Sequence, residues 1–245
     1  MSDSLLLLPD WPAPANVRAV CSTRQGGCST GLYASLNLGT HVADNAEQVA
    51  ENRQRYQSLA TMPSAPVWLN QVHGTAVCVL SKTSTQNNTA DAGITTEPGV
   101  VATVMTADCL PLLLCDKAGT RVAAVHAGWR GLCDGVIEAT LAHFTKPADV
   151  LVYLGPAISQ RAFEVGPEVR AAFITHSAQA AQAFISGTND KWQADLYLLA
   201  KQRLQACGVH HIFGGQYCTY QQRELFFSYR RDGQTGRMAS SIWLA

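Results

Sequence analysis

The sequence predicts an α+β fold, a single domain over residues 1–245 in which helices cover one or two β-sheets. Three observations predict it. Short runs rich in Val and Leu dominate the first part of the chain, helical periodicities mix with strands in the second part, and no repeat, charge block or long linker divides them. Hydrophobic residues make up 47% of the chain and charged residues 15%, which is ample material for a core.

The first segments are predicted to be a strand, a helix and a loop. "SLLLLPDWP" predicts a short strand that its two prolines end. Residues 44–60 have helical spacing, and Asp44 or Asn45 is placed to cap the start. The apolar face of this helix carries Val49, Tyr56 and Leu59. Residues 81–93 are polar and predict a loop.

Three consecutive buried strands are predicted in the centre of the chain, over "GVVATVMTA", "LPLLLCD" and "RVAAVHAG". "KAG" supplies the turn between the last two, so we expect an antiparallel hairpin. Cys109 and His126 then lie near opposite ends of paired strands, which places them at the same edge of the sheet.

The second half of the chain mixes helices and strands. "DVLVYLGPAIS" predicts a buried strand that ends in a Gly-Pro loop. Helices are predicted over "CDGVIEATLAHF", "GPEVRAAFITHSAQAAQAF" and "DLYLLAKQRLQACG", and Gly208 closes the last of them. The tail, "YCTYQQRELFFSYRRDGQTGRMASSIWL", predicts strands joined by the "DGQTG" turn.

Charge and cysteine content exclude several classes of function. Eighteen basic and eighteen acidic residues balance, which argues against a nucleic-acid partner. No stretch approaches the roughly 20 apolar residues that cross a bilayer, so we expect no membrane partner. None of the eight cysteines forms a C-x-x-C pair, which removes support for zinc ribbons and thioredoxin-like motifs. We expect a cytoplasmic protein with reduced thiols.

Three metal-competent side chains stand where a strand meets a loop: His73, Cys109 and His126. Two imidazoles and a thiolate are a three-ligand set of the kind that catalytic zinc sites use, with a fourth position left open. The same set also suits a blue-copper site, so Zn²⁺ is expected and Cu²⁺ stays an alternative. The competing interpretation is that these residues are hydrogen-bonded core histidines and a structural thiol.

Charged neighbours suggest further roles at the same place. Asp108 adjoins the thiol, where it can orient a ligand or move a proton. Arg130 follows His126 in a glycine-flanked turn that opens a helix, an arrangement that favours an anion. Arginines elsewhere that could add to it are Arg24, Arg230 and Arg231. The histidines without supporting context are interpreted as structural: His41, His143, His176, His210 and His211.

These segments resemble a known family nearly end to end. The resemblance rests on "STRQGGCSTGLYASLNLGTHVADN", "LNQVHG", "ADAGITTEPGVVATVMTADCLPLLLCD", "VAAVHAGWRGL", "YLGPAIS" and "FFSYRRDGQTGRMASSIWL". They are similar to the YfiH-type laccase-domain family, which is often labelled polyphenol oxidase. The resemblance implies an α/β/β/α layered sandwich with mixed sheets, and zinc held by His73, Cys109 and His126. It also implies phosphorolysis of adenosine, inosine and methylthioadenosine, with adenosine deamination as a second activity.

One departure from the family is visible. Relatives often carry a cysteine and a tyrosine just before "EVG", where this chain has "SQRAFEVG", so any role of those side chains is in doubt here. The chain also has no H-x-H motif, which excludes a four-copper oxidase, and it lacks the H-x-E and P-C-x-x-C signature of cytidine-type deaminases.

The resemblance makes purine nucleosides and phosphate the expected partners of a monomer or homodimer. Zinc and Arg130 would bind phosphate, and Asp108 or Glu164 would carry a proton. Candidates for the purine slot are Trp129, Phe163 and Tyr33. Three alternatives stay open: a metal-dependent amide hydrolase that edits peptidoglycan precursors, a copper-dependent polyphenol oxidase, and a non-catalytic metal-binding module.

Overall fold

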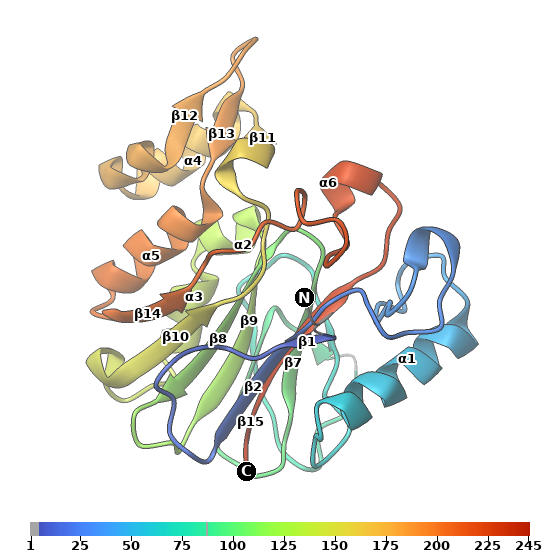
Figure 1. Ribbon diagram of the computed structural model, residues 1–245. Coiled ribbons are helices and arrows are strands. Elements are labelled where there is room, and N and C mark those ends of the chain that lie inside the picture. The colour runs from blue at the N-terminus through green and yellow to red at the C-terminus, as the bar shows by residue number, and fades with distance from the viewer. Residues whose placement is uncertain (1–4, 87) are drawn as a thin grey trace.

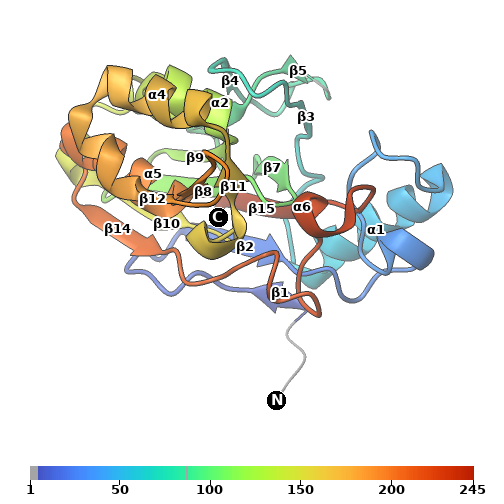
Figure 2. The ribbon, with the colours of Figure 1, turned by 90° about the horizontal axis from the view of Figure 1, so that it is seen from above.

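Two stacked β-sheets lie between two layers of helices in the computed structural model, which describes residues 5–86 and 88–245 (Figure 1). One sheet has the strand order β1-β2-β15-β7, and the other has the order β14-β10-β8-β9-β6-β4. Seen from above, α1 lies on the opposite side of the strands from α4 and α5 (Figure 2). The predicted α+β class and the α/β/β/α layering are therefore confirmed.

The four-stranded sheet is antiparallel throughout. Its strands are β1 (Leu6–Leu7), β2 (Val17–Ser22), β7 (Ala102–Thr106) and β15 (Met238–Leu244). The C-terminal strand β15 lies between β2 and β7, and all of its residues are buried. Helix α1 (Ala46–Leu59) covers the outer face, where Tyr56 is fully buried among side chains from this sheet.

The six-stranded sheet is mixed, because β4–β6 and β10–β14 pair in parallel while the other neighbours are antiparallel. Its strands are β4 (Val77–Val79), β6 (Ala92–Thr95), β8 (Leu110–Asp116), β9 (Val122–Ala127), β10 (Val150–Leu154) and β14 (His211–Gly214). Leu112 and Leu114 on β8 pack with the covering helices, and Leu113 packs against the four-stranded sheet. A strand covered on both faces explains a continuous Leu run without polar alternation.

Helices in the second half of the chain cover the outer face of the six-stranded sheet. They are α2 (Trp129–Asp134), α3 (Val136–Leu141), α4 (Pro167–His176) and α5 (Leu196–Ala206). Gly208 follows α5 with a φ of 83°, which confirms its predicted role at the helix end. The remaining short elements are β3 (Leu69–Asn70), β5 (Asn88–Thr89), β11 (Glu164–Val165), β12 (Phe184–Ser186), β13 (Trp192–Ala194), α6 (Tyr229–Asp232), and 3-10 turns at Gly31–Tyr33, Pro147–Asp149, Gln160–Ala162 and Ala178–Ala183.

The start of α1 is as predicted, but one end of its apolar face is not. The Asn45 side chain caps the helix by accepting from the backbone N–H groups of Glu47 and Gln48. Leu59 is 40% exposed, so its predicted burial is wrong. It is the last residue of the helix, where Ala60 packs against the core instead.

Two other predictions need correction. The polar segment 81–93 is not all loop, because β5 and the first residues of β6 lie within it. In the tail, no strand precedes the "DGQTG" turn within the described residues; α6 lies there instead. Adjacent Phe226 and Phe227 are both fully buried, but their segment pairs with no strand in the described part of the chain. Only β15, after the turn, is the strand that was predicted.

The central hairpin is confirmed and places the site. Strands β8 and β9 pair antiparallel, with Pro111 opposite His126 and Leu110 opposite Ala127. Because β7 belongs to the four-stranded sheet and β8 to the other, residues 107–109 cross between the sheets. Cys109 therefore stands at the end of the sandwich, close to the last residues of β9. No helix in the described part of the chain is long and apolar enough to cross a membrane.

Candidate metal centre and adjoining cavities

His126 approaches the centre from a rigid strand. It is the fifth residue of β9 and is 3% exposed. Its Nδ1 donates to Asp91 Oδ1 over 2.8 Å, and its backbone N–H donates to the Asp91 carbonyl over 2.7 Å. With Nδ1 engaged, Nε2 is the ring nitrogen left to bind a metal.

His73 approaches from a loop and is exposed. Its φ is 62°, in the left-handed region that residues other than glycine seldom adopt. The backbone N–H groups around it all donate to the Asp91 carboxylate: Val72 over 3.2 Å, His73 over 2.9 Å and Gly74 over 2.7 Å. One buried carboxylate thus holds this turn in place.

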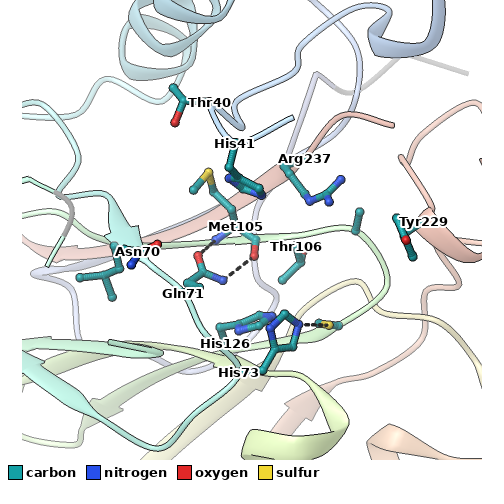
Figure 3. Close-up of a pocket in the computed structure, with 13 residues that line it drawn as sticks. Thr40, His41, Asn70, Gln71, His73, Met105, Thr106, His126, Tyr229 and Arg237 are labelled. Atoms are coloured by element: carbon teal, nitrogen blue, oxygen red, sulfur yellow. Dashed lines mark hydrogen bonds between the residues drawn. The ribbon is translucent and has the colours of Figure 1, made fainter. Parts of the chain in front are cut away.

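Cys109 completes the cluster at the start of β8. Its Sγ lies 3.8 Å from His73 Nε2, and the ligand atoms of His73, Cys109 and His126 all lie within 4.8 Å of one another. The two imidazole rings meet edge to face with centroids 4.8 Å apart (Figure 3). Tetrahedral zinc with ordinary bond lengths places S and N ligands about 3.6 Å apart, so this donor set fits such an ion.

Electrostatics in the cluster oppose the effect of burial. Burial raises the pKa of the Cys109 thiol, but His126 and His73 outweigh it and bring that pKa to about 6. Burial lowers the pKa of His126, but Cys109 and Asp91 outweigh it and raise that pKa to about 9. Without a metal, the cluster is a thiolate beside an imidazolium, and a metal ion has to replace the proton of His126.

Two glycines allow the parts of the cluster to approach one another. A Cβ at Gly128 would lie 2.6 Å from His73 Cδ2 and 3.3 Å from Cys109 Sγ. A Cβ at Gly131 would lie 2.7 Å from the carbonyl oxygen of Gly74. The "HAGWRG" segment is therefore glycine-rich because α2 begins directly against the His73 turn.

A cavity of about 720 Å³ opens above the cluster. It is lined by Thr40, His41, Leu69, Asn70, Gln71, His73, Met105, Thr106, Ala107, Cys109, His126, Tyr229 and Arg237. Figure 3 places His41 and Arg237 across the cavity from His73 and His126. None of the described residues that line it is acidic, so the cavity favours an anion.

Arg237 provides the positive charge of this cavity. Its Nη1 donates to the carbonyl oxygens of Thr235 and Gly236 over 2.9 and 3.1 Å, which fixes the guanidinium. Burial lowers the pKa of Arg237 below its usual value, although Cys109 and Asp108 act to raise it. Burial and then the neighbouring arginines Arg237 and Arg53 lower the pKa of His41, so that side chain is a neutral imidazole in the neutral pH range.

A second, apolar chamber of about 130 Å³ also adjoins Cys109. Its wall is formed by Ala107, Asp108, Cys109, Trp129, Ile158, Phe163, Leu196, Tyr229 and Arg230. Three of these also line the larger cavity: Ala107, Cys109 and Tyr229. Cys109 thus lines both a cationic compartment and an aromatic one.

The predicted catalytic residues fall in different places. Asp108 is buried beside Cys109, and its carboxylate accepts from Thr219 Oγ1 over 2.6 Å and from the backbone N–H of Arg230 over 2.7 Å. Arg130 is exposed, lies over the Trp129 ring and lines neither cavity. Glu164 is exposed on β11 and lines neither cavity.

Some of the aromatic and arginine candidates line a cavity and others do not. Trp129 and Phe163 line the apolar chamber, but Tyr33 is buried and lines neither cavity. Arg230 lines the chamber and donates to the carbonyl of Glu164. The guanidinium groups of Arg24 and Arg231 are held by backbone carbonyls of neighbouring loops.

Sequence reasoning missed Asp91, His41 and Arg237. Asp91 stands in the polar segment predicted to be loop, and only its place before the buried residues 92–95 hinted at a strand. His41 was interpreted as structural, yet it lines the cavity. Arg237 lies four residues after Gly233 of the predicted turn, and a lone arginine there carries no sign of a site.

A family model described as multi-copper polyphenol oxidoreductase laccase matches residues 18–245. The chain belongs to this laccase family. Among its relatives, a Shigella flexneri protein named purine nucleoside phosphorylase YfiH is 56% identical over 242 residues, which are 98% of this chain and 99% of that one. A Haemophilus influenzae protein named purine nucleoside phosphorylase is 47% identical over 238 residues, 96% and 97% of the two chains.

Solved structures of the laccase family share the fold. A Neisseria meningitidis protein superimposes with a TM-score of 0.93 at 51% identity and covers 98% of this chain and 99% of its own. A Bacillus licheniformis protein titled hypothetical protein YfiH has a TM-score of 0.90 at 28% identity, with 94% and 93% covered. The resemblance inferred from the sequence motifs is confirmed.

Proposed function

We propose that this chain is a zinc-dependent purine nucleoside phosphorylase. Its substrates are adenosine, inosine and methylthioadenosine together with phosphate, and adenosine deamination is a second activity of the same site. The names of the similar Shigella and Haemophilus proteins support the first part. The substrates, the metal and the deamination are our proposal.

The observation that carries the proposal is the pairing of two unlike compartments around Cys109. The larger one offers Arg237 and no described carboxylate, which suits phosphate. The smaller one is walled by Trp129 and Phe163, which suits the flat face of a purine. Phosphorolysis replaces the purine by phosphate at C1′ of a ribose, and the residues shared by both compartments would face that ribose.

His73, Cys109 and His126 would hold the zinc, which when bound supplies a Lewis acid for a phosphate or sugar oxygen. Arg237 binds the phosphate and aims one oxygen at C1′. That oxygen forms the new bond to C1′ as the bond from C1′ to the purine nitrogen breaks, and the base leaves with a proton. Trp129 and Phe163 hold the base in place and exclude water from it.

We assign the roles of the charged residues differently from the expectation drawn from the sequence. Anion binding moves from Arg130 to Arg237, because only Arg237 lines the cavity. Asp108 lines the chamber and is the better-placed proton carrier than Glu164, which lines neither compartment. Both Asp108 oxygens already accept hydrogen bonds, so it also fixes the backbone beside Tyr229.

Zinc-loaded protein incubated with inosine, with and without phosphate, tests the proposal. We expect hypoxanthine and ribose 1-phosphate only when phosphate is present. Adenosine without phosphate should yield inosine if deamination is real. Hypoxanthine release at the same rate with and without phosphate, or no release at all, would contradict a phosphorylase.

Matched arginine variants test the assignment of the phosphate subsite. Arg237→Ala should raise the KM for phosphate by roughly tenfold or more, because a charge-assisted hydrogen bond contributes about 1.5–3 kcal/mol. Arg130→Ala removes an arginine that is exposed and lines neither cavity, and should change that KM by less than about twofold. Equal effects of the two substitutions would refute the assignment.

Copper-dependent polyphenol oxidation is the second candidate, favoured by the family description and by the two-His-one-Cys donor set. Within residues 5–86 and 88–245, this is the one group of three or more His, Cys, Asp or Glu side chains placed to hold a metal. A trinuclear copper cluster needs a larger set. Oxygen uptake with a diphenol by copper-loaded protein, absent from zinc-loaded protein, would support the oxidase.

A further inference from the structure

The Asp91 carboxylate has an unusual set of partners. It is fully buried and accepts four hydrogen bonds. Oδ1 accepts from His126 Nδ1 over 2.8 Å and from the His73 backbone N–H over 2.9 Å. Oδ2 accepts from the backbone N–H groups of Gly74 over 2.7 Å and Val72 over 3.2 Å. One oxygen atom is therefore shared by the two histidines of the metal cluster.

Each of these bonds helps to orient the Nε2 lone pair of one of the two histidines. The bond to His126 selects the ring form with hydrogen on Nδ1, so that Nε2 faces the cluster. The bonds to residues 72–74 hold a left-handed backbone at His73, a conformation that costs free energy unless its surroundings impose it. By holding this backbone, Asp91 helps to keep His73 Nε2 at 3.8 Å from Cys109 Sγ, beside the close approach of α2 to the same turn.

We infer that Asp91 is a positioning residue for the metal centre, which aligns both histidines before a metal arrives. The inference rests on the proposed role of His73, Cys109 and His126 as ligands and adds a residue that touches no metal itself. A residue with a purely structural role would change the stability of the fold and leave the metal affinity of the folded chain unchanged.

Cobalt(II) binding by the Asp91→Asn variant distinguishes these roles. Asparagine has nearly the size of aspartate, but it offers one accepting oxygen, and its NH₂ group would face N–H donors. We expect the cobalt affinity of the folded variant, measured from visible absorption, to fall by about 10–100-fold, with an altered spectrum. Wild-type affinity and spectrum in folded Asp91→Asn would overturn the inference.

Asn52→Asp is the matched control. Asn52 is also fully buried; it accepts from the Cys28 N–H and donates to Ser29, Ser35 and Asn37, but none of these residues lines the cavity over the cluster. It should lower the unfolding temperature and leave the cobalt affinity within about twofold of wild type. An equal loss of affinity in both variants would assign the effect to general destabilisation and contradict positioning.

If Asp91→Asn does not fold, nitrogen-15 NMR of the zinc-loaded wild-type chain tests whether Asp91 orients His126. Ligation of His126 through Nε2, with a protonated Nδ1 protected from exchange, supports the inference. Ligation through Nδ1 overturns it. Cobalt binding needs no substrate, so a chain that binds cobalt as expected but releases no hypoxanthine would refute the proposed phosphorylase and leave the role of Asp91 standing.

Discussion

His126 and His73 offer the same imidazole to the same cluster, but they are supported in opposite ways. His126 is buried on a strand in the interior of the six-stranded sheet, paired with β6 and β8. His73 is exposed on a loop in a left-handed conformation. The strand therefore fixes one ligand through the sheet, whereas the other depends on hydrogen bonds from its turn to Asp91. Stability and metal binding should respond differently to changes at the two residues.

Alanine substitution of each histidine should give the largest contrast. His126→Ala leaves a buried hole and removes one donor from Asp91, so we expect about 2–4 kcal/mol less free energy of unfolding. His73→Ala removes an exposed ring and should cost less than about 1 kcal/mol. Both should weaken cobalt binding by more than about 100-fold. Urea unfolding of the metal-free chains and cobalt titration provide the measurements, and equal stability losses would contradict the contrast.

Gly128→Ala should act mainly on the His73 side of the cluster, where the new Cβ comes closest, and less on Cys109 Sγ at 3.3 Å. The new Cβ would lie 2.6 Å from His73 Cδ2, and the exposed ring moves away more easily than the strand does. We expect about tenfold weaker cobalt binding with less than about 1 kcal/mol lost from the free energy of unfolding.

Gly74→Ala provides the control for that substitution. Its Cβ would meet Asp91 Oδ2 at 3.5 Å, an ordinary contact, so cobalt affinity should stay within about twofold of wild type. A larger loss at Gly74 than at Gly128 would show that the close approach to His73 is not what limits binding.

The dependence of metal binding on pH should follow His126. Because the pKa of His126 is raised to about 9 and that of Cys109 is lowered to about 6, one proton leaves His126 on binding at pH 7 to 9. Apparent cobalt affinity should therefore rise about tenfold per pH unit across that range and level off above it. Below pH 6 the thiol is protonated too, so the affinity should fall more steeply.

Calorimetric titration in buffers of different ionisation enthalpy counts the released protons. Close to one proton at pH 7.5 agrees with an imidazolium at His126. No release at that pH would mean that the histidine is already neutral, and the thiolate–imidazolium pair would have to be abandoned.

Much of this arrangement could be predicted from the sequence because its patterns are local. The Leu run of β8, the "KAG" turn and the Val–Ala run of β9 predict a hairpin, which places Cys109 and His126 at one edge. The turn residues at Gly74 and Gly128 mark where the strands give way to loops. Helix α1 was predictable from its cap at Asn45.

What could not be predicted depends on contacts between distant parts of the chain. Asp91 acts through residues 72–74 and 126, and its surrounding sequence is polar enough to predict a loop. Arg237 reaches the cavity because β15 pairs with β7. The pair Met238–Thr106 joins residues 132 positions apart, which no local pattern predicts. The prediction of strands in the tail failed for a related reason, because Phe226 and Phe227 are buried against Ala107, where the chain crosses between the sheets.

The crossing of the chain between sheets at residues 107–109 has a consequence for the evolution of the family. Of the proposed metal ligands, His126 lies on β9 and Cys109 directly precedes β8 of the six-stranded sheet, whereas Met105, Thr106 and Arg237 stand on or beside strands of the other. Mutations in the second sheet can therefore change which molecule is recognised while the ligand set and its carboxylate support persist. A lineage can exchange its substrate without rebuilding its metal centre, and a shared cluster of ligands is a poor guide to a shared reaction.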